Sequence, residues 1–300
     1  MESLFTINDF MPSERKCVEV IRKLRWPDGI TCPRCNSKHA VKFSPHRKVM
    51  HRYLCRNCRR AFTDITGTVF ENSKIPLNEW FYIARELQRN ISINQITKDL
   101  GRKYDNVHNA ARKIMDSVFM QRLIELNGED MEVDEMYQSA GSKGTKQTGR
   151  EPRKRGLKLR GRGTYAKDKP PIVAAVQRGG GAVIEVFRNL CKKNIDAFLY
   201  HVTGRFVHTD DYRIYDHLDN MPGFRHVSVN HSKRRYAECY KHSNTVEGLF
   251  CDLRIWVRRY KGVCKDNLYR FVSLFQFNYN HRCLRPLETF TELLSTVIGR

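Results

Sequence analysis

The sequence predicts a multi-domain protein of the α+β and α/β classes, with two small N-terminal domains and a larger C-terminal domain. Three observations support this prediction. Two CxxC pairs lie close together near the N-terminus. Apolar residues with helical spacing fill residues 77–119, and short apolar runs that end in carboxylates follow residue 130. A chain of 300 residues is long enough for one to three domains with a substantial core.

The chain is strongly basic, with a formal net charge of +22 that is spread over both halves. Charge of this size attracts phosphate backbones without regard to sequence, so it favours a nucleic-acid partner over a merely soluble basic protein. The sequence has no run of eighteen apolar residues and no basic segment followed by an apolar one at its start. We therefore expect neither a membrane span nor a secretory signal, and a cytoplasmic, nucleoid-associated protein, or a nuclear one in a eukaryotic host.

The ten cysteines include two tight pairs at the separation typical of a zinc ribbon. Each CxxC turn aims two sulfurs at one ion, and four thiolates suit tetrahedral Zn²⁺. A redox CxxC or a coincidence is the alternative, but two pairs at this spacing favour a closed structural zinc site. The remaining cysteines are scattered, and we expect them to be reduced core thiols. The predicted zinc ligands are Cys32, Cys35, Cys55 and Cys58.

The first predicted domain, residues 1–70, combines this ribbon with a short helix over residues 11–25. Ser13 can cap that helix, and the turn chemistry of residues 26–29 ends it. The ribbon has little core of its own, so metal binding is expected to supply much of its folding energy. Its rim is basic, and we expect DNA contacts from Arg56, Arg59 and Arg60.

The second predicted domain, residues 71–125, has the pattern of a helix-turn-helix. One amphipathic helix begins near Leu77, and a later helix over residues 104–115 follows the turn at Gly101. The outward side chains of the later helix are types that reach base edges and phosphates. A purely structural pair of helices would look similar. The predicted DNA contacts are Lys103, Asn106, His108, Asn109, Arg112 and Lys113.

The third predicted domain, residues 126–300, contains a mixed sheet with flanking helices. A strand begins at Val133, and the hairpin strands 172–176 and 182–187 flank a triple-glycine turn. Further strands are expected at 206–209 and 226–230. The predicted helices are 191–202, 244–261 and 267–281.

A basic, glycine-rich loop is expected over residues 138–169. It is either a solvated linker or an arm that follows a phosphate backbone, and its place directly after Asp134 favours the arm. The basic residues expected to contact DNA are Arg153, Lys154, Arg155, Arg160 and Arg162.

Three acidic positions stand out in this basic chain. Asp134 and Asp210 each follow a short apolar strand, and Glu247 lies near the start of an amphipathic helix. If those strands are neighbours in a sheet, both aspartates meet at one edge. Carboxylates suit Mg²⁺, and two such ions can hold the attacking and leaving oxygens of a phosphodiester.

Each of these positions has an alternative. Glu135 lies beside Asp134, Asp211 lies beside Asp210, and Glu247 could be an ordinary surface acid. Two further side chains share the helical face of Glu247, namely Asn244 one turn before it and Arg254 two turns after it. Ser243 or Asn244 is expected to cap that helix.

Several motifs together resemble the DDE transposases of the bacterial insertion-sequence group related to eukaryotic Merlin elements. The resemblance runs nearly from end to end, and no single motif carries it. The matching segments are LRWPDGITCPRC (24–35), EVDEMY (132–137), HTD (208–210), VNHS (229–232), HSNTVEG (242–248) and FNYNHR (277–282).

This resemblance implies an RNase H-like catalytic domain that cuts and pastes DNA with Mg²⁺ or Mn²⁺. By analogy, Asp134 and Asp210 are metal ligands, and either Asn244 or Glu247 is the third. We favour Glu247, because a carboxylate binds Mg²⁺ better than an amide does. Two features depart from the family pattern: Arg254 replaces the common Lys, and no Gly-Gly pair follows the 132–137 motif.

The implied function is a transposase that binds terminal inverted repeats as a dimer or larger assembly on double-stranded DNA, cleaves the DNA and transfers a strand. The first alternative is a DNA-binding regulator that kept the ribbon and the helix-turn-helix but lost catalysis. Intact acids at each expected position argue against it. The second alternative is a metal-dependent nuclease that hydrolyses DNA without joining it.

Overall fold

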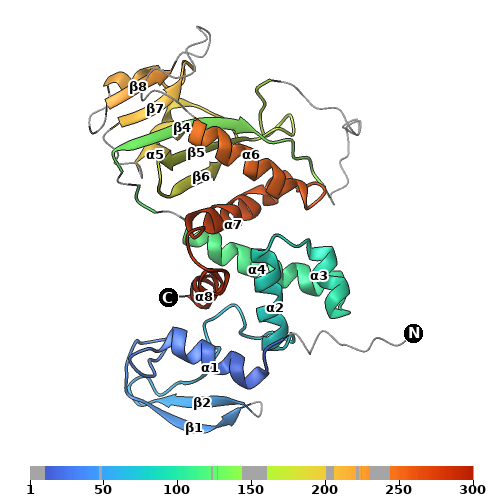
Figure 1. Ribbon diagram of the computed structural model, residues 1–300. Coiled ribbons are helices and arrows are strands. Elements are labelled where there is room, and N and C mark those ends of the chain that lie inside the picture. Colours follow the sequence, from blue (N-terminus) through green and yellow to red (C-terminus); the bar gives the residue numbers. More distant parts are fainter. Residues whose placement is uncertain are drawn as a thin grey trace. The chain divides into compact units, whose positions relative to one another are not determined.

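A computed structural model of the chain describes residues 11–46, 49–122, 124–126, 128–143, 161–200, 206–220, 223, 225–229 and 244–299 (Figure 1). Contacts group the chain into two compact units. The first unit comprises residues 1–118 and 284–300, and the second comprises residues 119–283. The C-terminal segment thus groups with the N-terminal region, whereas the sequence placed it in a domain over 126–300. Among the described residues, no helix has the length and apolar character needed to cross a membrane.

The first unit begins with helix α1 (Glu14–Arg25), whose first turn is capped as the sequence predicts, because the Ser13 hydroxyl accepts a hydrogen bond from the Lys16 amide. An antiparallel sheet follows in the order β1-β2-β3. Its first strand was not predicted from the sequence; the apolar side chains of Val41 and Phe43 in that strand are exposed rather than part of a core. The strands are β1 (Ala40–His46), β2 (Met50–Cys55) and β3 (Ala61–Thr63).

A buried carboxylate ties α1 to this ribbon. The side chain of Asp64 is fully buried and accepts two hydrogen bonds from the Arg22 guanidinium, at 2.7 and 3.0 Å. The Tyr53 hydroxyl and the His51 amide donate to the same carboxylate. Trp26 and Phe62 then pack against Tyr53, which gives the small module an aromatic core beside its cysteines.

In the part of the first unit that the structure describes, four further helices follow the ribbon. Helices α2 (Leu77–Gln88), α3 (Ile93–Leu100) and α4 (Tyr104–Met120) follow in sequence, and α3 ends at Gly101 in the left-handed conformation, with φ 60°. Helix α8 (Pro286–Ile298) packs against α1 and α2. The sequence analysis did not predict α8, although Pro286 occupies the first helical position, where proline is favoured.

The second unit is built on a mixed five-stranded sheet in the order β6-β5-β4-β7-β8. The three strands that come first in the chain pair antiparallel, and β7 and β8 add to the other side of β4 in parallel. This confirms the mixed sheet that the sequence predicts. The strands are β4 (Asp130–Tyr137), β5 (Pro171–Gln177), β6 (Ala182–Val186), β7 (Phe206–Asp210) and β8 (Arg225–Val229).

Helices cover both faces of this sheet. Met131 and Val133 of β4 face a core cluster with helix α5 (Lys192–Leu199) and Leu218 of the 3-10 helix η2 (Asp216–Asn220). Side chains alternate along a strand, so Glu132 points to the opposite face. Helix α6 (Asn244–Arg258) packs there on β4 and β5.

Helix α7 follows the 3-10 helix η4 and lies beside α6 and β6 (Figure 1). Its bounds are Leu268–Asn280, and those of η4 are Lys265–Asn267. The apolar side of α6 is buried as the sequence predicts, because Leu249, Phe250 and Leu253 are each nearly inaccessible to solvent. These contacts place the start of α6 over the face of β4 that carries its even-numbered residues.

Candidate functional site

Parallel pairing of β4 with β7 brings the two predicted aspartates together. The register aligns Glu132 with His208. Two residues further along each strand, Asp134 and Asp210 lie side by side on the same face of the sheet. The strands differ in one respect from the prediction, because β4 continues past Asp134 to Tyr137 where it pairs with β5. Only β7 ends at its aspartate.

Glu135 completes a cluster of three carboxylates. One oxygen each from Asp134, Glu135 and Asp210 lies within 4.8 Å of the others. Since Glu135 follows Asp134 on the strand, its side chain leaves from the opposite face, where the Tyr215 hydroxyl donates a hydrogen bond of 3.0 Å to it. The guanidinium of Arg162 lies 3.6 Å from the same carboxylate.

The neighbouring loop helps to hold this cluster. The Tyr212 amide donates to the Asp210 carboxylate at 3.0 Å, and the Arg162 guanidinium carbon lies 3.3 Å from the centre of the Tyr212 ring. The alternative acid Asp211 instead accepts a hydrogen bond of 2.6 Å from Ser228 on β8. These contacts favour Asp210 over Asp211 as the residue that joins the cluster.

The three residues predicted on α6 are Asn244, Glu247 and Arg254, and all are exposed to solvent. Glu247 is not in the group whose oxygens lie within 4.8 Å of one another. Its charge nevertheless acts on Asp134, as does that of Arg254. The start of α6 therefore lies in the electrostatic neighbourhood of Asp134, on the sheet face that Asp134 shares.

Burial and mutual repulsion raise the affinity of this cluster for protons. Burial raises the pKa of Asp134 to about 7; the Glu135 amide opposes this shift, whereas the charges of Asp210 and Glu247 add to it. Burial likewise raises the pKa of Glu135 to about 8, and the charges of Asp134 and Asp210 again contribute. The cluster is thus short of positive charge, which a bound cation would supply.

The cluster fits a hard divalent ion. Its donors are carboxylate oxygens, which are the ligands that Mg²⁺ and Mn²⁺ prefer. They converge from two neighbouring strands and are partly open to solvent, so waters and substrate oxygens can complete the coordination.

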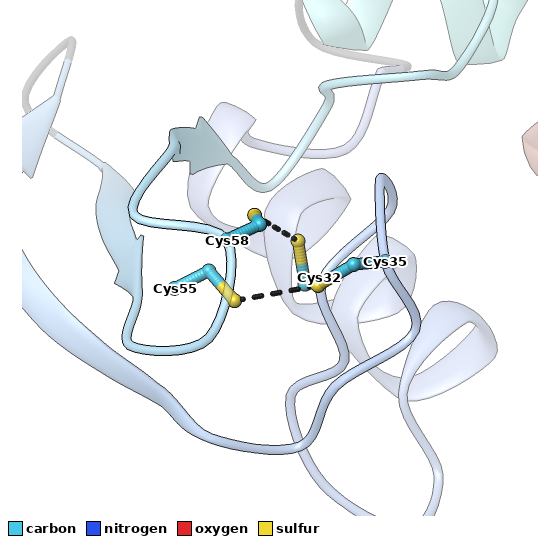
Figure 2. Close-up of side chains that lie close together, drawn as sticks. All are labelled: Cys32, Cys35, Cys55 and Cys58. Carbon is cyan, nitrogen blue, oxygen red and sulfur yellow. Dashed lines mark hydrogen bonds between the residues drawn. The ribbon is translucent and has the colours of Figure 1, made fainter.

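The four predicted cysteines also converge on one point (Figure 2). The sulfurs of Cys32 and Cys58 are 3.8 Å apart, and those of Cys35 and Cys55 are 3.6 Å apart. Tetrahedral Zn²⁺ with bonds of about 2.3 Å requires sulfur–sulfur separations of about 3.8 Å. The four side chains therefore fit structural zinc, as the sequence predicts.

The scattered cysteines differ from the prediction of core thiols. Cys17 is buried, but Cys191, Cys251 and Cys283 are exposed and Cys264 is partly exposed. Their spacing in sequence shows no helical or strand period, which explains why burial could not be predicted for them. Cys239 lies outside the described residues.

The predicted DNA-contact residues are mostly on the surface. Arg56, Arg59 and Arg60 are exposed on the ribbon. On and beside α4, His108 is half-buried and stacks on the ring of Tyr104, and the other predicted residues are exposed. Four residues of the basic loop, Arg153, Lys154, Arg155 and Arg160, lie outside the described residues. The exposed group is Lys103, Asn106, Asn109, Arg112 and Lys113.

These features together define a zinc-ribbon protein with an acidic cluster on a mixed sheet, and comparison with known proteins identifies its family. Residues 125–280 match the ISXO2-like transposase domain, and residues 12–61 match the transposase zinc-ribbon domain. The chain belongs to this family of insertion-sequence transposases, named IS1595, whose catalytic domain is of the DDE type.

A curated relative supports the assignment. The chain is 33% identical over 268 residues to an uncharacterized protein in the transposable element ISH50 of Halobacterium salinarum. The match covers 88% of this chain and 90% of the relative.

Two solved structures were also matched, the Mos1 strand transfer complex and a pre-cleavage Mos1 transpososome. Each is 9% identical to this chain, with TM-scores of 0.23 and 0.20. The matches cover 74% and 77% of this chain, and 81% and 82% of the respective Mos1 chains.

Zinc content tests the cysteine site. We expect the purified chain to contain about one zinc per molecule, and we expect Cys35→Ser to lose it because three thiolates no longer close the tetrahedron. Elemental analysis by mass spectrometry measures this directly. Cys191→Ser is the matched control, since that cysteine is exposed and distant in sequence from the site. Zinc retained in Cys35→Ser would contradict the assignment.

The pKa shifts predict how stability depends on pH in buffer without added divalent ions. In an unfolded chain these carboxyls titrate near pH 4, so between about pH 4 and 8 the folded protein binds more protons than the unfolded one. Stability must therefore fall as pH rises through this window. We expect the double variant Asp134→Asn, Glu135→Gln to be more stable than the wild type by about 2 kcal/mol at pH 8.

Urea unfolding at pH 4.5 and pH 8 measures this difference. At pH 4.5 the advantage of the double variant is expected to be much smaller, because the wild-type carboxyls are then largely protonated in the folded state. The same pH dependence in both proteins would show that the cluster does not cause it.

Proposed function

We propose that this protein is a cut-and-paste DNA transposase that binds the terminal inverted repeats of its element. The observation that carries the proposal is the pairing of β4 with β7, which places Asp134 beside Asp210 on the face covered by α6. A net charge of +22 attracts nucleic acid, whereas a cluster of carboxylates repels its phosphates. Cations bound by the cluster would offset that repulsion.

The strand order supports an RNase H-like catalytic domain. Three antiparallel strands are followed by two that extend the sheet in parallel on the other side of the first. The first and fourth strands of that arrangement are β4 and β7, which carry the two aspartates.

Sheet geometry favours Glu247 over Glu135 as the third member of the catalytic group. Glu247 lies on the helix that packs on the same sheet face as Asp134, and its charge acts on that residue. Glu135 leaves from the other face and is engaged by Tyr215 and Arg162. Asn244 lies one helical turn before Glu247 and is the alternative ligand. Divalent ions bound by Asp134, Asp210 and Glu247 would polarise the scissile phosphate and stabilise the attacking and leaving oxygens.

The chain's own residues then have distinct roles. The carboxylates of Asp134 and Asp210 would hold the ions at the sheet edge, and Arg254 would supply positive charge to a phosphate on the α6 side. Water attacks the phosphorus, the bond to the 3′-oxygen breaks, and a proton leaves the water for solvent as the 3′-hydroxyl forms. That hydroxyl next attacks a target phosphodiester, and the 3′-oxygen of the target strand departs. No external reductant or oxidant is required.

DNA binding is assigned to the ribbon and to α4. The exposed side chains of α4 include both amides and cations, a mixture suited to base edges and phosphates. The three-helix segment α2 to α4 with its turn at Gly101 supports a helix-turn-helix. Since transposition joins two ends, we expect a dimer or larger assembly on DNA.

Strand transfer tests the catalytic proposal. Purified protein, Mg²⁺ or Mn²⁺, a labelled terminal-repeat duplex and target DNA should give joined products. We expect Asp210→Ala to reduce joining by at least about a hundredfold, the scale found when a metal-held electrostatic contribution is lost. Comparison of Asn244→Ala with Glu247→Ala identifies the third ligand, because only the true ligand should match Asp210→Ala.

Two outcomes would change the proposal. Cleavage without joined products would indicate a nuclease. DNA binding without cleavage or joining under any divalent ion would indicate a regulator that kept only the binding domains. Asp28→Ala is a suitable control for the alanine variants, since it is an exposed acid in the other unit.

Salt dependence of end binding tests the role of α4. We expect Arg112→Ala and Lys113→Ala each to weaken binding and to lower the slope of log affinity against log salt by about one, because each removes one phosphate contact. Fluorescence anisotropy at several salt concentrations measures both quantities. Lys74→Ala, an exposed lysine of the same unit outside α4, is the control and should leave the slope unchanged. If the slope is unchanged in all three variants, α4 does not contribute to the DNA interface.

A further inference from the structure

Glu132, an acid on β4 outside the carboxylate cluster, contacts helix α6, which carries Glu247. The side chain of Glu132 is fully buried, with an exposed fraction of 0%. An ionised carboxylate in such a place is costly unless hydrogen bonds and an opposite charge compensate it. Glu132 therefore needs partners, and the structure supplies them from two distant segments.

The first set of partners is the start of α6. The Thr245 and Val246 amides donate to one oxygen of Glu132, at 2.8 and 3.0 Å, and the Thr245 hydroxyl donates to the other at 3.0 Å. The first amides of a helix have no partner within the helix, and its N-terminus attracts negative charge. Glu132 thus caps α6 from a strand that lies more than a hundred residues earlier.

The second partner is Arg178, which follows β5. Its guanidinium Nε lies 2.7 Å from the Glu132 carboxylate and its amide donates to the Asp130 carbonyl. The guanidinium balances the buried negative charge of Glu132. The hydrogen bonds that the helix amides donate to this carboxylate are charge-assisted and therefore strong. From the sequence alone, Ser243 or Asn244 is expected to cap this helix. Ser243 lies outside the described residues, and the cap seen here is a tertiary contact.

The position of Glu132 gives this cap a consequence for the site. Glu132 and Asp134 are two residues apart on β4 and share a sheet face, and Glu247 lies one residue beyond the amide of Val246. One rigid connection therefore runs from the strand of Asp134 through Glu132 to the first turn of α6. Apolar packing by Val246, Leu249 and Phe250 holds the helix on the sheet. Such packing leaves the first amides of the helix without acceptors, and two of them donate to Glu132.

We propose that Glu132 is a positioning residue for the catalytic group, in that it holds the first turn of α6 so that Glu247 faces Asp134 and Asp210. This inference rests on the proposed function for the identity of the catalytic group. The capping contact itself does not, and the two can be tested separately.

Hydrogen exchange and Mn²⁺ binding by the full zinc-bound chain provide the test. We expect Glu132→Gln to speed amide exchange in the first turn of α6 by about tenfold while exchange in its last turn is unchanged. We also expect Mn²⁺, titrated alone and followed by electron paramagnetic resonance, to bind about five- to tenfold more weakly. A merely structural role would speed exchange throughout the sheet and leave Mn²⁺ affinity unchanged.

Two further variants sharpen the comparison. Glu185→Gln is the matched control, because it also removes a strand carboxylate from an arginine, at 3.1 Å from Arg122, but does not touch α6. It should change neither readout. Thr245→Val removes one hydrogen bond to Glu132 while the charge stays paired, and it should shift both readouts in the same direction by about threefold. This milder variant decides the question if Glu132→Gln does not fold.

The outcomes are distinct. Unchanged first-turn exchange in Glu132→Gln and Thr245→Val, or a uniform increase with unchanged Mn²⁺ affinity, would overturn the positioning role. If the wild type binds no Mn²⁺, the proposed catalytic function fails. Exchange in the first turn of α6 then still decides whether Glu132 holds the helix.

Discussion

Parallel pairing between β4 and β7 is the constraint on which the candidate site depends. Its register is set where Asp130 to Glu132 of β4 meet Phe206 to His208 of β7. A shift of one residue would turn Asp134 or Asp210 to the face of α5, among apolar side chains, so the buried core on that face opposes any slip. The pairing therefore fixes the relative position of two charges that would otherwise move apart.

The same arrangement stores electrostatic repulsion. Burial, and after it the repulsion from neighbouring carboxylates, raises the pKa of Asp134 and of Glu135, so the folded chain bears a cost in the absence of cations. Two compensating features limit that cost. Tyr215 and Arg162 engage Glu135, and the positive charge of Arg254 acts on Asp134. The carboxylates at the partly exposed side of the site still repel one another, and bound divalent ions would relieve that repulsion.

Local sequence patterns predicted most of the elements but not the contacts that orient them. Alternation and apolar runs located β5 and β7, helical spacing located α6, and the CxxC pairs located the zinc site. The strand β1 and the helix α8 were not predicted; the side chains of β1 are mostly exposed, so its sequence pattern marks no face that packs on a core. The contact of Glu132 with the start of α6 could not be predicted, because a local pattern contains no information about a strand residue more than a hundred positions away.

The candidate site shows the same limit. Asp134 and Asp210 could be predicted to meet because each is associated with a short apolar strand, and the sheet needed only to pair those strands. Whether Glu135 or Glu247 joins them depends on which sheet face α6 covers, and no periodicity in the sequence specifies that. Glu132 stands between the apolar residues Met131 and Val133, and an acid that is buried at such a position signals a tertiary partner.

The most direct test of this account is the position of Mn²⁺ by anomalous diffraction from crystals of the protein with a DNA end. We expect Mn²⁺ between the carboxylates of Asp134 and Asp210, with a further ligand from Glu247 or Asn244 at the start of α6. Mn²⁺ bound away from Asp134 and Asp210, or held by Glu135 on the opposite face without any ligand from α6, would contradict the account.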